Sequence, residues 1–82
     1  GPALYRVVRM LIWLAENSPE PDFFLPGRKD IGIMLGISTE TASRIIAELR
    51  RDKILQTLGD WRASADVPAL RAIIKEPVVS LV

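Results

Sequence analysis

The sequence contains neither cysteine nor histidine. Disulfide bridges, zinc sites built from these side chains, and nucleophilic or acid–base catalysis by them are therefore excluded. The lack of cysteine fits a reducing, cytoplasmic setting. No apolar run approaches the roughly 20 residues that span a bilayer, and the N-terminus lacks a basic region followed by a cleavage site. We therefore expect a soluble protein without a membrane partner.

The sequence also lacks a charge pattern typical of catalysis. The acidic residues are scattered singly and no glycine-rich phosphate loop is present, so no spacing supports a general acid–base pair. We expect neither an enzyme nor a bound cofactor or metal in this chain. The net charge of +1 is low for a DNA-binding domain. Residues 28–53, however, include six basic and four acidic side chains, and this mild excess of positive charge predicts modest non-specific binding to nucleic acid.

At 82 residues and 49% hydrophobic content, the chain predicts one small globular domain, residues 1–82, with a core of barely sufficient size. Apolar spacing predicts an amphipathic helix over residues 4–16, with an inward stripe and with Trp13 at its rim. The stripe consists of Leu4, Val8, Leu11, Ile12 and Ala15. A loop with two prolines follows at residues 17–22. Residues 23–25 are then expected to form a short strand or extended segment that packs its rings beneath the helices.

Residues 30–54 predict two helices joined by a tight turn, the arrangement of a helix-turn-helix. Helical spacing of apolar residues stops at Gly36 and resumes after Ser38. The inward residues are Ile31, Met34 and Leu35 in the first helix, and Ala42, Ile45, Ile46 and Leu49 in the second. Gly36 suits a left-handed helix end, Ile37 fills the angle between the helices, and Ser38 is a good N-cap.

If the second helix buries its apolar face, its N-terminal half turns four polar residues outward, toward a major groove. These candidates for base contacts are Thr39, Glu40, Ser43 and Arg44. Arg44 can bridge the two acceptors of a guanine edge, and Glu40 can accept from a cytosine amino group. The alternative for each is an ordinary surface side chain, with Arg44 paired to Glu40 or Glu48 four residues away.

The chain after the second helix predicts a β-hairpin. Residues 54–58 and 61–65 flank Gly59-Asp60, a two-residue turn with glycine first. Trp61 is expected to shield the sheet or cover the helices. Asp66 is a fair N-cap for a last helix through about Glu76, whose inward residues are Leu70, Ile73 and Ile74. The apolar tail, residues 78–82, needs a partner surface on this domain or on a neighbouring chain.

The motif resembles the DNA-binding domain of the Crp/Fnr family of bacterial transcription regulators. The likeness rests on Ile31-Gly32 through Gly36, on Ser38-x-Glu40-Thr41-x-Ser43-Arg44, and on Leu49 and Ile54. It is close over residues 28–55 and loose beyond them. It implies a mainly α fold with a small β wing, a winged helix, with the helix-turn-helix at about 28–53 and the wing at about 54–65.

The resemblance also implies the function. It assigns base contacts to Glu40 and Arg44, and the Glu-x-x-Ser-Arg arrangement is similar to the Fnr branch, which implies a TTGA-like half-site with the base opposite Thr39 left open. Phosphate contacts are expected from Arg28 and Lys29, at the helix end that lies across the DNA backbone; the alternative is that both are ordinary solvated side chains. Ser38 and Thr41 are further phosphate candidates, with capping as the alternative for Thr41.

Family members act as homodimers on palindromic DNA, and a contact with RNA polymerase is expected in the full-length protein. The sensory and dimerisation domains of such proteins are not among these 82 residues, so the effector stays open. Two departures from the family pattern concern the wing. Lys53 stands where glycine or asparagine is common, and Asp60 puts an acid at the tip.

A different function is also compatible with the pattern. The low net charge, the acidic wing tip, exposed Ile33 and the apolar tail favour a winged helix used as a protein-interaction module. The two hypotheses differ in which residues govern binding. In the first, Arg44, Arg28 and Lys29 govern binding to a duplex. In the second, the surfaces at Ile33 and residues 78–82 govern binding to a protein.

Overall fold

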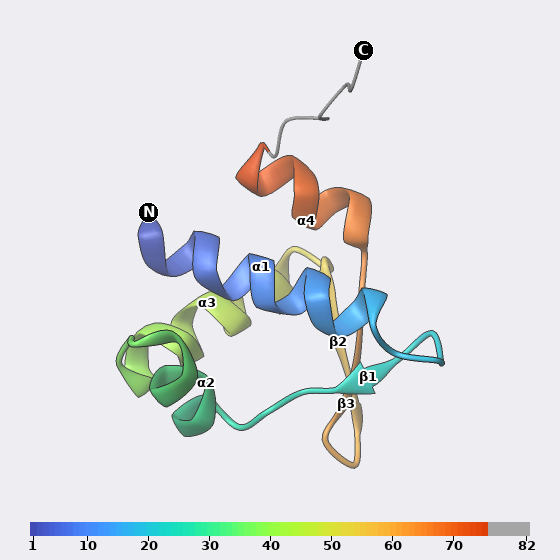
Figure 1. Cartoon of the computed structure of the whole chain (residues 1–82), viewed down its shortest axis with the longest axis horizontal. Coiled ribbons are helices and arrows are strands. Elements are labelled where there is room, and N and C mark those ends of the chain that lie inside the picture. The colour runs from blue at the N-terminus through green and yellow to red at the C-terminus, as the bar shows by residue number, and fades with distance from the viewer. Residues whose placement is uncertain (76–82) are drawn as a thin grey trace.

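The computed structural model describes residues 1–75, in which four helices are accompanied by a small antiparallel sheet at one side (Figure 1). The elements in chain order are α1 (Pro2–Glu16), β1 (Phe23–Phe24), α2 (Arg28–Leu35), α3 (Thr39–Arg51), β2 (Leu55–Gly59), β3 (Arg62–Ala65) and α4 (Val67–Ile74). The strands are ordered β1-β3-β2. The predicted mainly α architecture with a β wing is confirmed.

Helix α1 crosses the middle of the molecule and organises the core. Figure 1 shows α4 on one side of it, with α2, α3 and the sheet on the other. The helix begins at Pro2, earlier than the predicted residue 4, since proline at the first helical position loses no hydrogen bond and already has a helical φ. Arg71 Nη2 lies 2.6 Å from Glu16 Oε2 and ties α4 to the end of α1.

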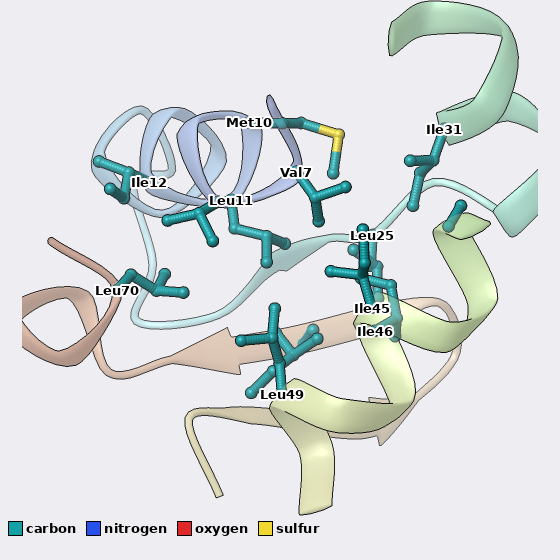
Figure 2. Close-up of a cluster of buried hydrophobic side chains, with 14 of the residues drawn as sticks. Val7, Met10, Leu11, Ile12, Leu25, Ile31, Ile45, Ile46, Leu49 and Leu70 are labelled. Atoms are coloured by element: carbon teal, nitrogen blue, oxygen red, sulfur yellow. The ribbon is translucent and has the colours of Figure 1, made fainter. Parts of the chain in front are cut away.

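The core lies where α1, α3, α4 and the sheet meet (Figure 2). Its fully buried side chains include Leu11 from α1, Ile46 from α3 and Leu70 from α4. All four predicted inward residues of α3 are buried, which confirms the periodicity of that helix. In α1 the prediction is right for Val8, Leu11 and Ile12. Leu4 and Ala15 are only partly buried, and Val7 and Met10 are buried although the stripe omitted them.

Two apolar residues lie on the opposite side from the one predicted. Met34 is 59% exposed, because the eight-residue α2 buries Ile31 and Gly32 instead and so turns Met34 outward. Of the two phenylalanines in β1, Phe23 is buried but Phe24 is exposed. Successive side chains of a strand point to opposite faces, so only one ring can pack beneath the helices.

The hairpin turn lies one residue later than predicted. Gly59 pairs with Arg62, so the turn residues are Asp60 and Trp61, both with positive φ, at 50° and 61°. Gly59, with φ of 83°, sits at a register irregularity after Thr57, where a left-handed residue makes a bulge. Trp61 is 69% exposed and does not shield the sheet, contrary to expectation. A bulky left-handed residue is an outlier that stores strain.

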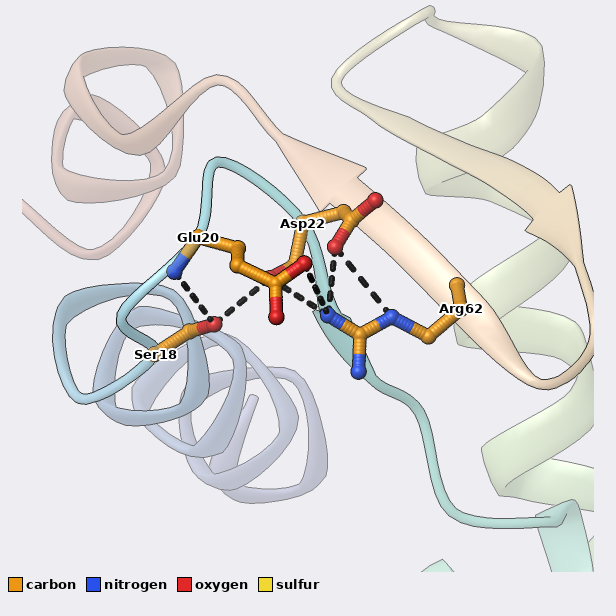
Figure 3. Close-up of polar contacts among 4 residues, drawn as sticks. All are labelled: Ser18, Glu20, Asp22 and Arg62. Carbon is orange, nitrogen blue, oxygen red and sulfur yellow. Dashed lines mark hydrogen bonds and ion pairs between the residues drawn. The ribbon is translucent and has the colours of Figure 1, made fainter.

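The loop between α1 and β1 is fastened to the wing by Arg62 (Figure 3). Its guanidinium donates to the Asp22 carboxylate through Nε (3.2 Å) and Nη2, and Nη2 also donates to the Asp22 carbonyl oxygen (3.1 Å). The hydrogen bond to Asp22 raises the pKa of the Arg62 guanidinium. Within the loop, Ser18 Oγ donates to the same carbonyl (2.6 Å) and accepts from the Glu20 N–H (3.2 Å). The sequence alone had not indicated this link.

Helix α4 begins as predicted and ends early. Asp66 Oδ1 accepts from the Ala69 N–H (3.1 Å), as an N-cap should. The helix ends at Ile74 rather than near Glu76, with Lys75 left-handed at φ 46°. Leu70 is fully buried, whereas Ile73 and Ile74 are only partly so. The apolar tail, residues 78–82, lies outside the described residues.

Candidate nucleic-acid interface

The corner between α2 and α3 has the geometry that the sequence predicts. Gly36 is left-handed, with φ of 69°, and ends α2. The N–H groups of Gly36 and Ile37 both donate to the carbonyl oxygen of Gly32, the latter at 3.0 Å. The chain therefore reverses into α3 with the last turn of α2 still hydrogen-bonded, which holds the two helices at a fixed angle.

Gly32 allows the backbones to approach more closely than any side chain would. A Cβ on this residue would lie 2.7 Å from the Ile37 carbonyl oxygen and 3.4 Å from the Thr39 nitrogen. Both neighbours are backbone atoms of the corner, so neither can move aside as a side chain could. Periodicity gave no reason for a glycine here, although a glycine inside a predicted helix is itself a signal of close packing.

Ser38 caps α3 in the predicted way. Its Oγ accepts from the Thr41 N–H (3.0 Å) and donates to the Thr41 hydroxyl (2.8 Å). Glu40 lies in the first turn, where its carboxylate meets the positive end of the helix dipole. Thr41 Oγ1 is the acceptor in this pair, so its own proton stays available for a neighbouring anion.

Ser38→Ala should lower the free energy of unfolding by about 0.5–2 kcal/mol, the usual cost of losing an N-cap acceptor. Denaturant unfolding monitored by circular dichroism measures it. Thr41→Val is the matched control, because it removes the hydroxyl contact but keeps the capped N–H. A larger loss in Thr41→Val than in Ser38→Ala would show that the hydroxyl pair, rather than the cap, stabilises this corner.

The four candidates for base contacts lie together on the outer side of the N-terminal half of α3. Because Ala42, Ile45 and Ile46 are buried on the inner side, Thr39, Glu40 and Arg44 are exposed and Ser43 is half-buried. These positions follow directly from the burial that the sequence predicted. Whether they contact bases remains a prediction.

Arg44 has one ion-pair partner among the described residues, and it is weakly held. Its Nη1 lies 3.6 Å from Glu48 Oε1, one turn further along the helix, and not against Glu40. The Arg44 side chain is 63% exposed. An exposed pair with this spacing contributes only about 0.3–0.5 kcal/mol, so the guanidinium can exchange Glu48 for another acceptor at little cost.

Arg28 and Lys29 occupy the first turn of α2, as expected. Lys29 is exposed, whereas Arg28 is half-buried. Partial burial lowers the pKa of the Arg28 guanidinium, and the positive charge of Arg50 lowers it further. The same surface thus receives positive charge from the start of α2 and from the end of α3.

A non-glycine residue at the base of the wing has a left-handed backbone. Lys53 is left-handed, with φ of 60°, between α3 and β2. Its N–H donates to the Arg50 carbonyl oxygen at 3.0 Å, which closes the end of α3. At the other end of the hairpin, Asp60 is exposed in the turn. The tip of the wing is therefore acidic, whereas basic side chains such as Lys53 lie near its root.

Residues 1–75 hold no cluster of three or more side chains that could bind a metal ion. Over the same residues, no helix combines the length and apolar character needed to cross a membrane.

Residues 5–73 match the family model of a Crp-like helix-turn-helix domain. The structure is similar to that of FixK2 from Bradyrhizobium japonicum, with a TM-score of 0.79 and 26% identity over 95% of this chain and 40% of that one. It is also similar to the catabolite activator protein of Thermus thermophilus, with a TM-score of 0.66 and 26% identity over 89% of this chain and 33% of that one. No curated protein matches the sequence. The chain thus spans well under half the length of either solved protein.

Proposed function

The chain belongs to the family of Crp-like helix-turn-helix domains, and from this membership we propose that it binds double-stranded DNA sequence-specifically as part of a bacterial transcription regulator. The observation that carries the proposal is the outward placement of Glu40 and Arg44 at the N-terminal half of α3, opposite a fully buried inner face. In helix-turn-helix proteins this half of the second helix enters the major groove.

We propose a TTGA-like half-site. The support is the Glu-x-x-Ser-Arg arrangement of α3, which is similar to the Fnr branch of the family, together with the exposure of its glutamate and arginine. Arg44 would bind the O6 and N7 acceptors of the guanine, and Glu40 would accept from the amino group of a cytosine. The base opposite Thr39 stays unassigned.

Two such domains would act together on a palindrome, with half-sites about one helical turn apart. We propose that the full-length protein is a homodimer that contacts RNA polymerase in the bacterial cytoplasm. A single domain would bind weakly, because it offers few contacts and a net charge of only +1.

The test is binding of the domain, joined to a second copy, to a duplex that contains TTGAT and its inverted repeat. The same duplex with the half-sites scrambled is the comparison, and both are measured at two salt concentrations. The proposal predicts tighter binding to the palindrome at both concentrations. Equal binding to the two duplexes would refute the sequence-specific part.

A second candidate function rests on the apolar surface of α2. Ile33 is 72% exposed and its neighbour Met34 is also exposed, an uncommon pair on an eight-residue helix. Such a surface fits a protein partner. Ile33→Ser with Met34→Ser discriminates between the hypotheses, since DNA binding by α3 should survive the double variant whereas binding of a protein to α2 should not.

A further inference from the structure

An open groove separates the C-terminal half of α3 from β2. It has a volume of about 440 Å³, and its lining residues are Ala47, Arg50, Arg51, Leu55, Gln56 and Thr57. An adjoining hollow of about 300 Å³ is lined by Arg50, Lys53, Leu55 and Gln56. Arg50, Leu55 and Gln56 line both. Ala47, the smallest of these side chains, leaves room for a ligand beside the helix.

The groove is basic and contains no acidic side chain. Within residues 1–75, no carboxylate lies within ion-pair distance of Arg50, Arg51 or Lys53. Arg28 adds positive charge nearby, since Arg50 contributes to the lowered pKa of its guanidinium. Like charges that are not ion-paired to a carboxylate repel one another, and an anion bound among them would relieve that repulsion.

The groove continues the outer face of α3. Arg51 follows Arg44 by seven residues, close to two helical turns, so both point to the same side. The separation along the axis is about 10 Å, at about 1.5 Å per residue. This is comparable to the ~12 Å width of the major groove. When Arg44 reaches the bases, the end of α3 therefore lies at the rim, where phosphates are found.

We propose that this groove binds the phosphate backbone of the same duplex that α3 reads, with Arg50 and Arg51 as the charged contacts and Gln56 and Thr57 as neutral donors. The inference rests on the proposed DNA binding and adds residues to it. A guanidinium fits a phosphate because two parallel N–H groups match two oxygens. These contacts would lie at the root of the hairpin, away from its acidic tip at Asp60.

The alternative explanation for the two arginines is helix stability. Positively charged side chains in the last turn of a helix offset the negative end of its dipole, and Arg50 and Arg51 occupy that turn of α3. This accounts for their place in the helix but not for the basic groove that extends to Lys53 and β2. The two explanations differ in what a substitution changes, either unfolding or the salt dependence of DNA binding.

The experiment measures the affinity of two joined copies of the chain for a duplex from about 50 to 200 mM salt, for the parent and with Arg50→Gln or Arg51→Gln in both copies. Each phosphate contact contributes about 0.9 to the slope of log K against log salt. We expect each variant to reduce the slope by about that amount for each copy, equally for the palindrome and the scrambled duplex. Arg50→Lys and Arg51→Lys should keep the slope, because the charge remains.

Lys75→Gln is the matched control, since it removes a positive charge at the end of α4, on another side of the molecule. It should leave the slope unchanged, and all variants should keep the unfolding midpoint of the parent. If Arg50→Gln and Arg51→Gln behave like Lys75→Gln while the parent binds DNA, the groove proposal is overturned and DNA binding stands. If the parent binds neither duplex, both the groove proposal and the proposed DNA binding are refuted.

Discussion

Gly32→Ala is expected to lower the free energy of unfolding by about 1–3 kcal/mol, the range for a group forced into a filled space. The added Cβ would meet the Ile37 carbonyl oxygen at 2.7 Å. To relieve this contact, α2 must move away from the corner. The loss is large for a small domain, because native proteins are stable by only about 5–15 kcal/mol. Chemical denaturation with a fitted transition midpoint measures it.

Gly27→Ala is the matched control for this substitution. A Cβ at residue 27 would have only ordinary contacts, at 3.9 Å and 4.0 Å, and its φ of −62° suits alanine. Replacing a glycine lowers the conformational entropy of the unfolded chain, which stabilises the fold, whereas alanine is less favourable than glycine at a helix N-cap. The two effects on the free energy of unfolding should nearly cancel, to within about 0.5 kcal/mol. If both variants were equally stable, the close approach at Gly32 would not be a constraint.

Arg44→Ala is expected to lose about 1–3 kcal/mol of the preference for the palindrome over the scrambled duplex, the usual value for a bidentate contact to guanine. Binding to the scrambled duplex should fall much less, because the lost contact is to a base edge. Competition binding with both duplexes at one salt concentration gives the difference directly.

Glu48→Gln separates the two roles that Arg44 could have. It abolishes the ion pair of 3.6 Å and keeps the arginine. If Arg44 reads DNA, Glu48→Gln should retain the preference for the palindrome, whereas Arg44→Ala loses it. If both variants bind like the parent, Arg44 is an ordinary surface side chain and α3 does not read the half-site in the proposed way.

The sequence predicted α3 well because that helix is long and strongly amphipathic. Thirteen residues with four buried positions leave only one way to place the helix on the core, and the outward residues follow from it. In the eight-residue α2 the periodic signal is weak, and the contact of Gly32 with the corner decides how the helix is turned. Met34 was therefore placed on the wrong side.

The wing shows a second limit of sequence reasoning. Gly59 predicted the turn, but the chain uses this glycine for the bulge in β2 and places Asp60 and Trp61 in the turn at positive φ. A glycine marks a left-handed residue without saying which of two neighbouring features needs it. Similarly, the groove at Arg50 and Arg51 depends on β2 packing beside α3, which no local pattern encodes.

The fastening of the wing has a consequence for the entropy of binding. A free two-stranded hairpin is barely stable, but here β3 is held by β1, by Arg62 on the Asp22 loop, and by the Leu25 N–H on the Trp61 carbonyl oxygen (2.8 Å). The hairpin is already ordered before any ligand arrives. A duplex that meets β2 and the end of α3 would therefore immobilise few additional bonds, and a weakly charged domain can keep more of its contact energy as affinity.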